Sequence, residues 1–343
     1  MESVNIKQLA KILNISISTV SKALRDSHDI SKETKERVIA LATELNYQPN
    51  PHASSLRKAK SKTIAVIIPE IANNYFSLAI NGIESIAQEK GYHVLIYLTH
   101  ESYQKEVAMI RLLHSGRVDG ILISISSTTT DYSHIEELQA KGLPVVFFDR
   151  VCENFNTVSI TTDDYESALN ATNHLVQQGC KKIAHLMISK NLSIGDKRLK
   201  GYLNALKDHQ LQIDDSLIIS CTNDEEEDFA LVKDLLEKRK PDGIFAAVER
   251  YAISAYEACR QLNISIPNDV KIISFSNLQT ASLLDPSLTT ITQPAFEIGR
   301  QAATILFRAL EEKRYQLKNE KIVYKSRLIQ RDSTSKSYKK LKV

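Results

Sequence analysis

The amino-acid sequence predicts an α/β protein in which a small all-α domain precedes a larger core of two doubly wound lobes, each built on a parallel sheet. Two observations lead to this prediction. Residues 1–48 contain no glycine and have the apolar spacing of three short helices. After Thr63, buried strands alternate with amphipathic helices, and this alternation occurs twice along the chain.

The first predicted helix is short and ends in a tight turn. Ile6, Leu9, Ala10 and Leu13 form its apolar stripe. Asn14 follows, and asparagine is the non-glycine residue that best tolerates a left-handed backbone. We therefore expect the chain to turn at Asn14 and to enter a second helix almost at once.

The second predicted helix begins after Ser16, whose side chain is a suitable N-cap. Val20 and Leu24 face inward from this helix. Its outer face consists of one isoleucine with small, polar and cationic side chains, namely Ile17, Ser18, Ser21, Lys22 and Arg25. A helix with such a face suits the major groove of DNA.

The third predicted helix, capped by Ser31, completes a helix-turn-helix domain. Its buried stripe consists of Val38, Leu41, Ala42 and Leu45. Residues 1–60 carry ten Lys/Arg against six Asp/Glu, a net charge of +4, whereas the rest of the chain carries 34 against 35, a net charge of −1. This local positive excess fits a phosphate-binding surface, and a solvated charged linker is the alternative.

The alternation of strands and helices in the core occurs twice along the chain. Strand-like segments of the first half lie at residues 64–68, 93–98, 120–124 and 145–148. The segment Arg117–Ser124 is echoed by Lys240–Ala247, and Leu143–Asp149 is echoed less closely by Val270–Ser276. Two similar lobes with a cleft between them are the natural interpretation, and ligands of such sheets bind at the carboxyl ends of the strands.

Composition and motifs argue against several classes of protein. Cys152, Cys180, Cys221 and Cys259 lack metal-binding or redox spacing, which predicts reduced thiols in a cytoplasmic protein without a bound metal. We expect neither a signal peptide nor a membrane span, since no apolar segment has the required character. The sequence shows no glycine-rich phosphate loop and no nucleophile elbow, so we expect neither an enzyme nor a cofactor.

Several short motifs occur in a specific order along the chain. The N-terminal ones are Ile6–Lys11, Ile15–Leu24, Ser31–Val38, Leu45–Asn50 and Ala53–Arg57. The core ones are Val118–Ile121, Arg198–Tyr202, Ile266–Val270 and Leu288–Pro294. Together they resemble the LacI/GalR (lactose-repressor) family of transcription regulators over nearly the full length.

The resemblance implies a homodimer that binds double-stranded, pseudo-palindromic operator DNA, and a sequence-specific regulator that acts as a repressor. It also implies that a small molecule, a sugar or a sugar derivative, binds between the core lobes and changes operator affinity. A solute-binding protein with the same two-lobed core is the alternative, although its N-terminus would not carry a helix-turn-helix.

The expected domains follow the same resemblance. A helix-turn-helix domain at residues 1–48 precedes a hinge segment at 49–61, a periplasmic-binding-protein-like core at 62–332 and a flexible tail at 333–343. Within the core we expect one lobe at about 62–160 with 293–320. The other lobe is expected at 161–292 with 321–332.

By position, Ile17, Ser18 and Lys22 match the base-reading residues of the family. The phosphate-facing positions are Ser16, Thr19, Ser21, Thr34, Tyr47 and Asn50. Lys22 stands where the family usually has arginine and offers a point charge in place of a bidentate fork. Arg25 stands where asparagine is usual and is expected to add a phosphate contact, and both could instead be solvated cations.

In the hinge segment, Leu56 matches a leucine that the family inserts into the minor groove, with Ala53 one turn before it. An exposed leucine in a basic segment suits such a wedge. Packing of Leu56 on the core is the alternative.

The resemblance also implies effector-binding residues at the ends of the core strands: Tyr75, Phe76, Ser124, Arg150, Asp163, Asp164, Arg198, Glu249 and Ser276. Phe76 could instead belong to the core, and Arg198 could be a structural bridge. Glu249 and Ser276 depart from the family's usual acids, which favours an anionic ligand such as a sugar phosphate or sugar acid. Alternatively, nearby carboxylates such as Asp163, Asp164 and Glu249 neutralise both arginines and leave a neutral pocket.

Overall fold

The structure, a computed structural model, describes residues 4–47, 60–113, 116–153, 155–222, 224–312 and 314–336. The chain divides into two compact units, Met1–Lys60 and Ser61–Val343. Among the helices of the described ranges, none combines the length and the apolar character that a membrane span requires.

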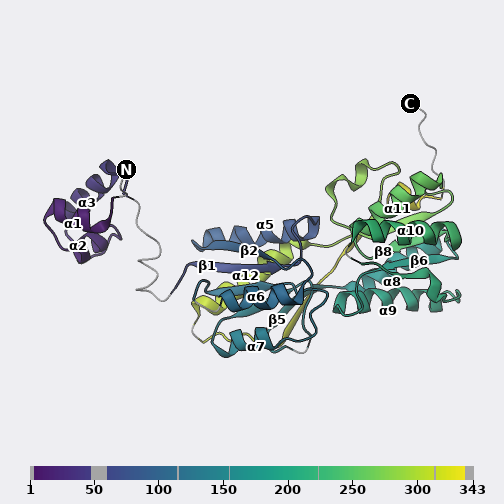
Figure 1. The fold of residues 1–343 in the computed structure, drawn as a ribbon, viewed down its shortest axis with the longest axis horizontal. Coiled ribbons are helices and arrows are strands. Elements are labelled where there is room, and N and C mark those ends of the chain that lie inside the picture. The colour runs from purple at the N-terminus through teal and green to yellow at the C-terminus, as the bar shows by residue number, and fades with distance from the viewer. Residues whose placement is uncertain are drawn as a thin grey trace. The chain divides into compact units, whose positions relative to one another are not determined.

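The N-terminal unit contains α1 (Ile6–Leu13), α2 (Ile17–Ala23) and α3 (Lys32–Glu44) (Figure 1). Asn14 ends α1 in the left-handed conformation with φ 52°, and the side chains of Ser16 and Ser31 cap α2 and α3. The three helices close on a small apolar core of Leu9, Ala10, Val20, Ala23, Val38 and Ala42. This packing leaves the outer face of α2 to solvent.

The first lobe of the larger unit is built on a six-stranded sheet with the order β11-β5-β4-β3-β1-β2. Its strands are β1 (Thr63–Ile68), β2 (His93–Leu98), β3 (Gly120–Ile123), β4 (Val145–Phe148), β5 (Val158–Thr162) and β11 (Glu320–Tyr324). Its helices are α5 (Asn74–Glu89), α6 (Tyr103–Leu113), α7 (Ser133–Ala140) and α12 (Ala295–Glu311). Alternate residues of β1 pack on α5 with α12 and on α6 with α7, so helices cover both faces.

The second lobe repeats this plan with the strand order β12-β10-β9-β8-β6-β7. Its strands are β6 (Ile183–Met187), β7 (Ile218–Ser220), β8 (Gly243–Ala246), β9 (Lys271–Phe275), β10 (Thr289–Thr292) and β12 (Arg327–Ile329). Its helices are α8 (Asp164–Gln177), α9 (Ser193–Asp208), α10 (Glu225–Lys238) and α11 (Glu249–Leu262). Apart from the antiparallel pair of β10 and β12, the described strand pairs are parallel, and the predicted fold class is confirmed.

Two glycines allow the main helices of the first lobe to touch. A Cβ added to Gly82 of α5 would lie 2.1 Å from the Phe296 carbonyl oxygen, and one added to Gly299 of α12 would lie 2.0 Å from that of Ala79. Only glycine permits this approach. Helix α12, which comes from far along the sequence, is therefore an integral part of the first lobe.

In the described part of the chain, three segments cross between the lobes: after β5, after β10 and after β11. The last crossing differs from the expected division at residues 320 and 321. Strand β11 pairs with β5 through Tyr324, so the chain leaves the first lobe only after this residue. Because β11 is a half-exposed edge strand, its sequence carries no run of buried residues that would have marked it.

Candidate functional site

The outer face of α2 presents the side chains expected to read bases. Ile17 is 40% exposed, and Ser18 and Lys22 are also exposed. Lys22 Nζ lies 3.0 Å from Asp29 Oδ2, with 47% and 44% of the two side chains exposed. An ion pair so accessible to water contributes little stability, and it can be exchanged for a contact with DNA.

The hydroxyl groups expected to face phosphate also fix the helix ends. Ser16 Oγ accepts a hydrogen bond from Thr19 N at 3.0 Å, and Thr34 Oγ1 lies 2.8 Å from Ser31 Oγ. Arg25 donates to both the carbonyl and the hydroxyl of Ser21 at 2.9 Å, which lays its guanidinium along α2. These side chains therefore stabilise the ends of α2 and α3.

Tyr47 is half-buried against the core of the N-terminal unit, and burial raises the pKa of its hydroxyl. The remaining predicted DNA-binding residues, Asn50, Ala53 and Leu56, lie outside the described residues.

A buried ion pair forms the centre of the predicted effector site. Arg198 of α9 donates from Nε and Nη2 to Asp164 Oδ1 at 2.8 and 2.7 Å, and from Nη1 to the Ala247 carbonyl at 2.6 Å. Its guanidinium lies 3.7 Å from the centre of the Phe275 ring. Arg198 and Asp164 are only 2% and 1% exposed. Burial raises the pKa of Asp164, although Arg198 opposes this shift.

Tyr75 and Asp149 of the first lobe lie within electrostatic reach of this pair. Burial raises the pKa of Tyr75 well above its usual value, Asp149 and Asp164 add to the shift, and Arg198 opposes it. Burial also raises the pKa of Asp149 to about 6, while Arg150 and Arg198 act in the opposite direction. Asp149, which follows β4 of the first lobe, therefore lies in one buried cluster with Asp164 and Arg198 of α8 and α9 in the second lobe.

Several polar atoms of this cluster lack a well-formed hydrogen bond to other described atoms of the protein. The Tyr75 hydroxyl, Asp164 Oδ2 and Arg150 Nε are buried and form no well-oriented hydrogen bond within the described ranges, although Asp149 lies close to the Tyr75 hydroxyl and 3.9 Å from Arg150 Nε, and Thr162 lies close to Asp164. The hydroxyl of Ser193, at the start of the helix α9 that also carries Arg198, is likewise buried without a hydrogen-bond partner within the described ranges. Buried polar groups are rarely left unpaired, so such atoms indicate a place where a polar ligand binds.

Arg150 is held by a residue that the sequence analysis did not assign. Its Nη1 donates to Glu101 Oε1 at 2.6 Å, and Glu101 Oε2 accepts from Ser127 N at 2.7 Å. Burial opposes ionisation of Glu101, but Arg150 and Ser127 outweigh it and lower its pKa. Both arginines of the site are thus paired with carboxylates, Arg150 with Glu101 and Arg198 with Asp164.

Other predicted site residues have partners elsewhere. Phe76 is 2% exposed and packs edge-to-face on Phe148 in the core of the first lobe. Asp163 Oδ1 accepts from Ser167 Oγ and Ser326 N, both at 2.8 Å, and so joins two of the crossing segments. Among the described residues, Asp163 forms an ion pair with neither arginine, and it acts as a structural link.

The other three predicted site residues, Ser124, Glu249 and Ser276, lie in two different parts of the core. Ser124 Oγ donates to Asp149 Oδ2 at 3.4 Å, which ties it to the buried cluster. Ser276 Oγ donates instead to Glu249 Oε2 at 2.9 Å. Asp149 was missed as a site residue, although its left-handed backbone, φ 61°, at the end of β4 is typical of a functional strand end.

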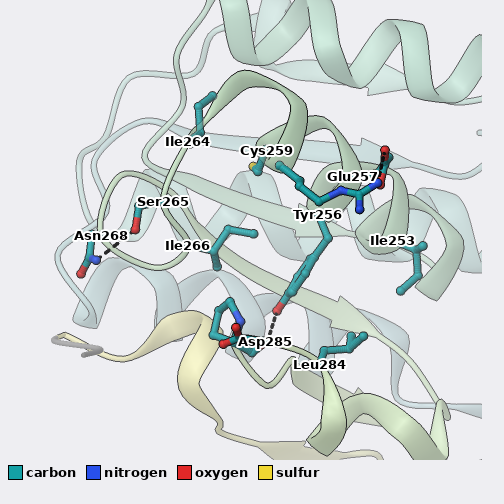
Figure 2. A pocket seen from close by; sticks show the side chains of 12 residues that line it. Ile253, Tyr256, Glu257, Cys259, Ile264, Ser265, Ile266, Asn268, Leu284 and Asp285 are labelled. Atoms are coloured by element: carbon teal, nitrogen blue, oxygen red, sulfur yellow. Dashed lines mark hydrogen bonds and ion pairs between the residues drawn. The ribbon is translucent and has the colours of Figure 1, made fainter. Parts of the chain in front are cut away.

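The second lobe also carries a separate groove of about 550 Å³, which shares no lining residue with the predicted effector site (Figure 2). Ile253, Tyr256, Ile266 and Leu284 line it, and the Tyr256 hydroxyl donates to the Pro286 carbonyl at 2.9 Å. Within the described ranges, no three His, Cys, Asp or Glu side chains are grouped in a way that could hold a metal ion.

Comparison with known proteins covers both units. Residues 5–50 match the family described as bacterial regulatory proteins, lacI family. Residues 61–332 match the periplasmic binding proteins and sugar binding domain of the LacI family. The ribose operon repressor of Halalkalibacterium halodurans is 31% identical over 90% of this chain and 91% of its own length. The regulator DegA of Bacillus subtilis is 31% identical over 96% of this chain and 98% of its own length.

Solved structures of similar proteins agree with these sequence matches. A LacI family regulator from Enterococcus faecium with bound ribose is 26% identical, with a TM-score of 0.71 over 80% of this chain and all of the other. The lac repressor dimer bound to operator has a TM-score of 0.84 over 97% of this chain and all of its own, and at 22% identity it shows the fold. The match at residues 5–50 removes the solute-binding alternative. The chain therefore belongs to the LacI family of DNA-binding transcriptional regulators, and its core is a sugar-binding domain of that family.

Proposed function

We propose that this regulator represses transcription as a homodimer on a pseudo-palindromic operator, and that a neutral sugar bound at Tyr75, Asp149, Asp164 and Arg198 changes its operator affinity. Relatives named as repressors support the first part, among them the ribose operon repressor and the Escherichia coli repressor CytR, which is 32% identical over 88% of this chain. The proposal of a bound sugar rests on the buried polar atoms beside the Arg198–Asp164 pair that lack a well-formed hydrogen bond.

The pairing of both arginines favours a neutral ligand over the anionic one that the sequence suggested. A phosphate or carboxylate would meet two arginines whose charges Glu101 and Asp164 already balance, and only the unpaired Nε of Arg150 is left to bind it. Sugar hydroxyls can instead donate to Asp164 Oδ2 and accept from the Tyr75 hydroxyl. Solved relatives whose ligands are ribose and D-xylulofuranose, 26% and 30% identical to this chain, are consistent with such a ligand.

A sugar screen tests the proposed ligand. Thermal-shift and calorimetric measurements would compare neutral pentoses and hexoses with their phosphates and acids, followed by gel shifts on the DNA upstream of the chain's own gene. We expect a neutral sugar to bind and to change the gel shift. Tight binding of only the phosphorylated or acidic sugars would contradict the neutral-ligand proposal.

Lys22 is expected to read a base. Lys22→Ala should relax sequence preference at one or two base pairs per half-site and cost about 1–3 kcal/mol of binding. Selection from random DNA, followed by competition gel shifts, would measure this change. Lys11→Ala, which removes the same charge from the exposed surface of α1, is the matched control and should leave preference intact. A uniform loss across all sequences with a smaller salt slope would make Lys22 a phosphate contact.

We propose that the β2 edge of the first lobe takes part in the dimer. Strand β2 ends the sheet order, and its Leu95 and Ile96 are 41% and 40% exposed. Apolar side chains on an exposed edge strand are unfavourable in a monomer and favour pairing with another chain. A two-fold dimer also matches the symmetry of a pseudo-palindromic site.

Ile96→Lys tests this surface. A charge buried in an apolar contact should raise the dimer dissociation constant by about 100-fold, or roughly 2.7 kcal/mol. Analytical ultracentrifugation would measure it. Val323→Lys is the control, because Val323 is 57% exposed on β11 at the opposite edge of the same sheet. If both variants remain dimeric, or if only Val323→Lys dissociates, the β2 edge is not the interface.

A further inference from the structure

The start of α11 joins the second lobe to the first. Of its first two residues, Glu249 contacts Asn74 at the start of α5, and Arg250 contacts Glu70 in the segment that precedes α5. This contact is independent of the effector cluster, because it uses neither Arg198 nor Asp164. Of its residues, Glu249 stands where the family usually carries aspartate.

The Glu249 carboxylate is shared between the two lobes. On the first-lobe side, Oε1 accepts from the backbone and side-chain nitrogens of Asn74 at 3.3 and 2.8 Å. On the second-lobe side, Oε2 accepts from Ser276 Oγ at 2.9 Å and Asn277 N at 3.2 Å. Both oxygens are therefore occupied by groups of the chain itself, so this carboxylate already has the partners that ligand hydroxyls would otherwise supply.

Arg250 adds a second link beside it. Its Nη1 lies 3.4 Å from both carboxylate oxygens of Glu70 in the first lobe. Asn73 orients Glu70 by donating from Nδ2 to Oε1 at 3.0 Å, and its own Oδ1 caps α5 at Tyr75 N. The Arg250 and Glu70 side chains are 25% and 29% exposed, so solvent weakens this pair, and it acts together with the Glu249 hydrogen bonds.

We propose that Glu70, Asn74, Glu249 and Arg250 form a polar latch that holds the two lobes closed in the ligand-free chain, so that closure does not require a small molecule. The latch also bears on the effector site. Asn73 and Asn74 immediately precede Tyr75, so release of the latch shifts the end of α5 that carries the Tyr75 hydroxyl.

Distance measurement on the ligand-free full-length chain tests the latch and does not depend on the identity of any effector. Spin labels at exposed Glu84 on α5 and Glu237 on α10 would report the separation of the lobes by double electron–electron resonance. The background would have its native cysteines replaced: Cys152, Cys180, Cys221 and Cys259. We expect a single narrow distance distribution for the otherwise unchanged chain.

The double variant Glu249→Ala/Arg250→Ala should increase the open population about tenfold, because two partly exposed polar links are lost together. Asn74→Asp keeps the length of the side chain and should also open the lobes, because it places a second carboxylate against that of Glu249. The control Glu257→Ala/Arg260→Ala removes an ion pair within the same helix and should leave the distance unchanged. An open distribution in the parent chain, or unchanged distances in both latch variants, would overturn the proposal.

Discussion

Removal of residues 1–60 should abolish operator binding and leave a folded core. The exposed face of α2 and the local positive charge lie in this segment, whereas the remaining chain has a net charge of −1. Gel shifts at several salt concentrations would measure the loss. Retention of a specific shift by the truncated core would show that DNA binds elsewhere.

The full-length chain provides the quantitative comparison. Its operator affinity should fall by about a thousandfold or more between 50 and 200 mM salt if the dimer contacts six or more phosphates, because each contact releases bound counterions. Circular dichroism and the sugar screen on the truncated core would show whether its two lobes remain folded and able to bind a ligand.

Arg198→Met should be the most damaging single substitution in the core. It leaves the Asp164 carboxylate buried without its counter-charge and the Ala247 carbonyl without a donor. Breaking such a pair from one side costs about 3–5 kcal/mol. Urea denaturation would measure this loss, and sugar binding should disappear with it.

A double variant distinguishes the net contribution of the ion pair to stability from the cost of leaving one buried charge without its partner. Arg198→Met/Asp164→Leu removes both charges, and replacement of a buried pair by apolar residues is often neutral. We therefore expect it to recover most of the stability but not the sugar binding. A loss of under about 1 kcal/mol for Arg198→Met alone would show that water reaches Asp164 and that the pair is not a buried centre.

The sequence predicts the N-terminal unit well because its signals are local. Asn14, Ser16 and Ser31 each act within a turn of their own position, and the capping geometry confirms all three. The buried strands are also local, since a run such as Ile64–Ile68 is apolar without interruption. Strand β11 was divided wrongly because its place in the first sheet depends on pairing with β5, which lies far away in sequence.

The candidate site was predictable only in part for the same reason. The family motifs direct attention to Arg150, Asp164 and Arg198, but they do not say which carboxylate each arginine would meet. Glu101 lies in a loop with left-handed backbone at His100 and Glu101, and nothing near it in sequence indicates a partner at Arg150. Glu249 was expected among the ligand-binding residues, whereas its contacts depend on how the two lobes close.

The late return of the chain to the first lobe has a consequence for synthesis. The three N-terminal helices are complete soon after they leave the ribosome, at about 5–20 residues per second. The first sheet, in contrast, waits for α12 and β11, which end at Glu311 and Tyr324. Until then, the apolar faces of α5 and β1 are uncovered in the nascent chain. A premature stop before α12 therefore leaves a finished DNA-binding unit attached to a core with uncovered apolar faces, which is a substrate for proteases and chaperones.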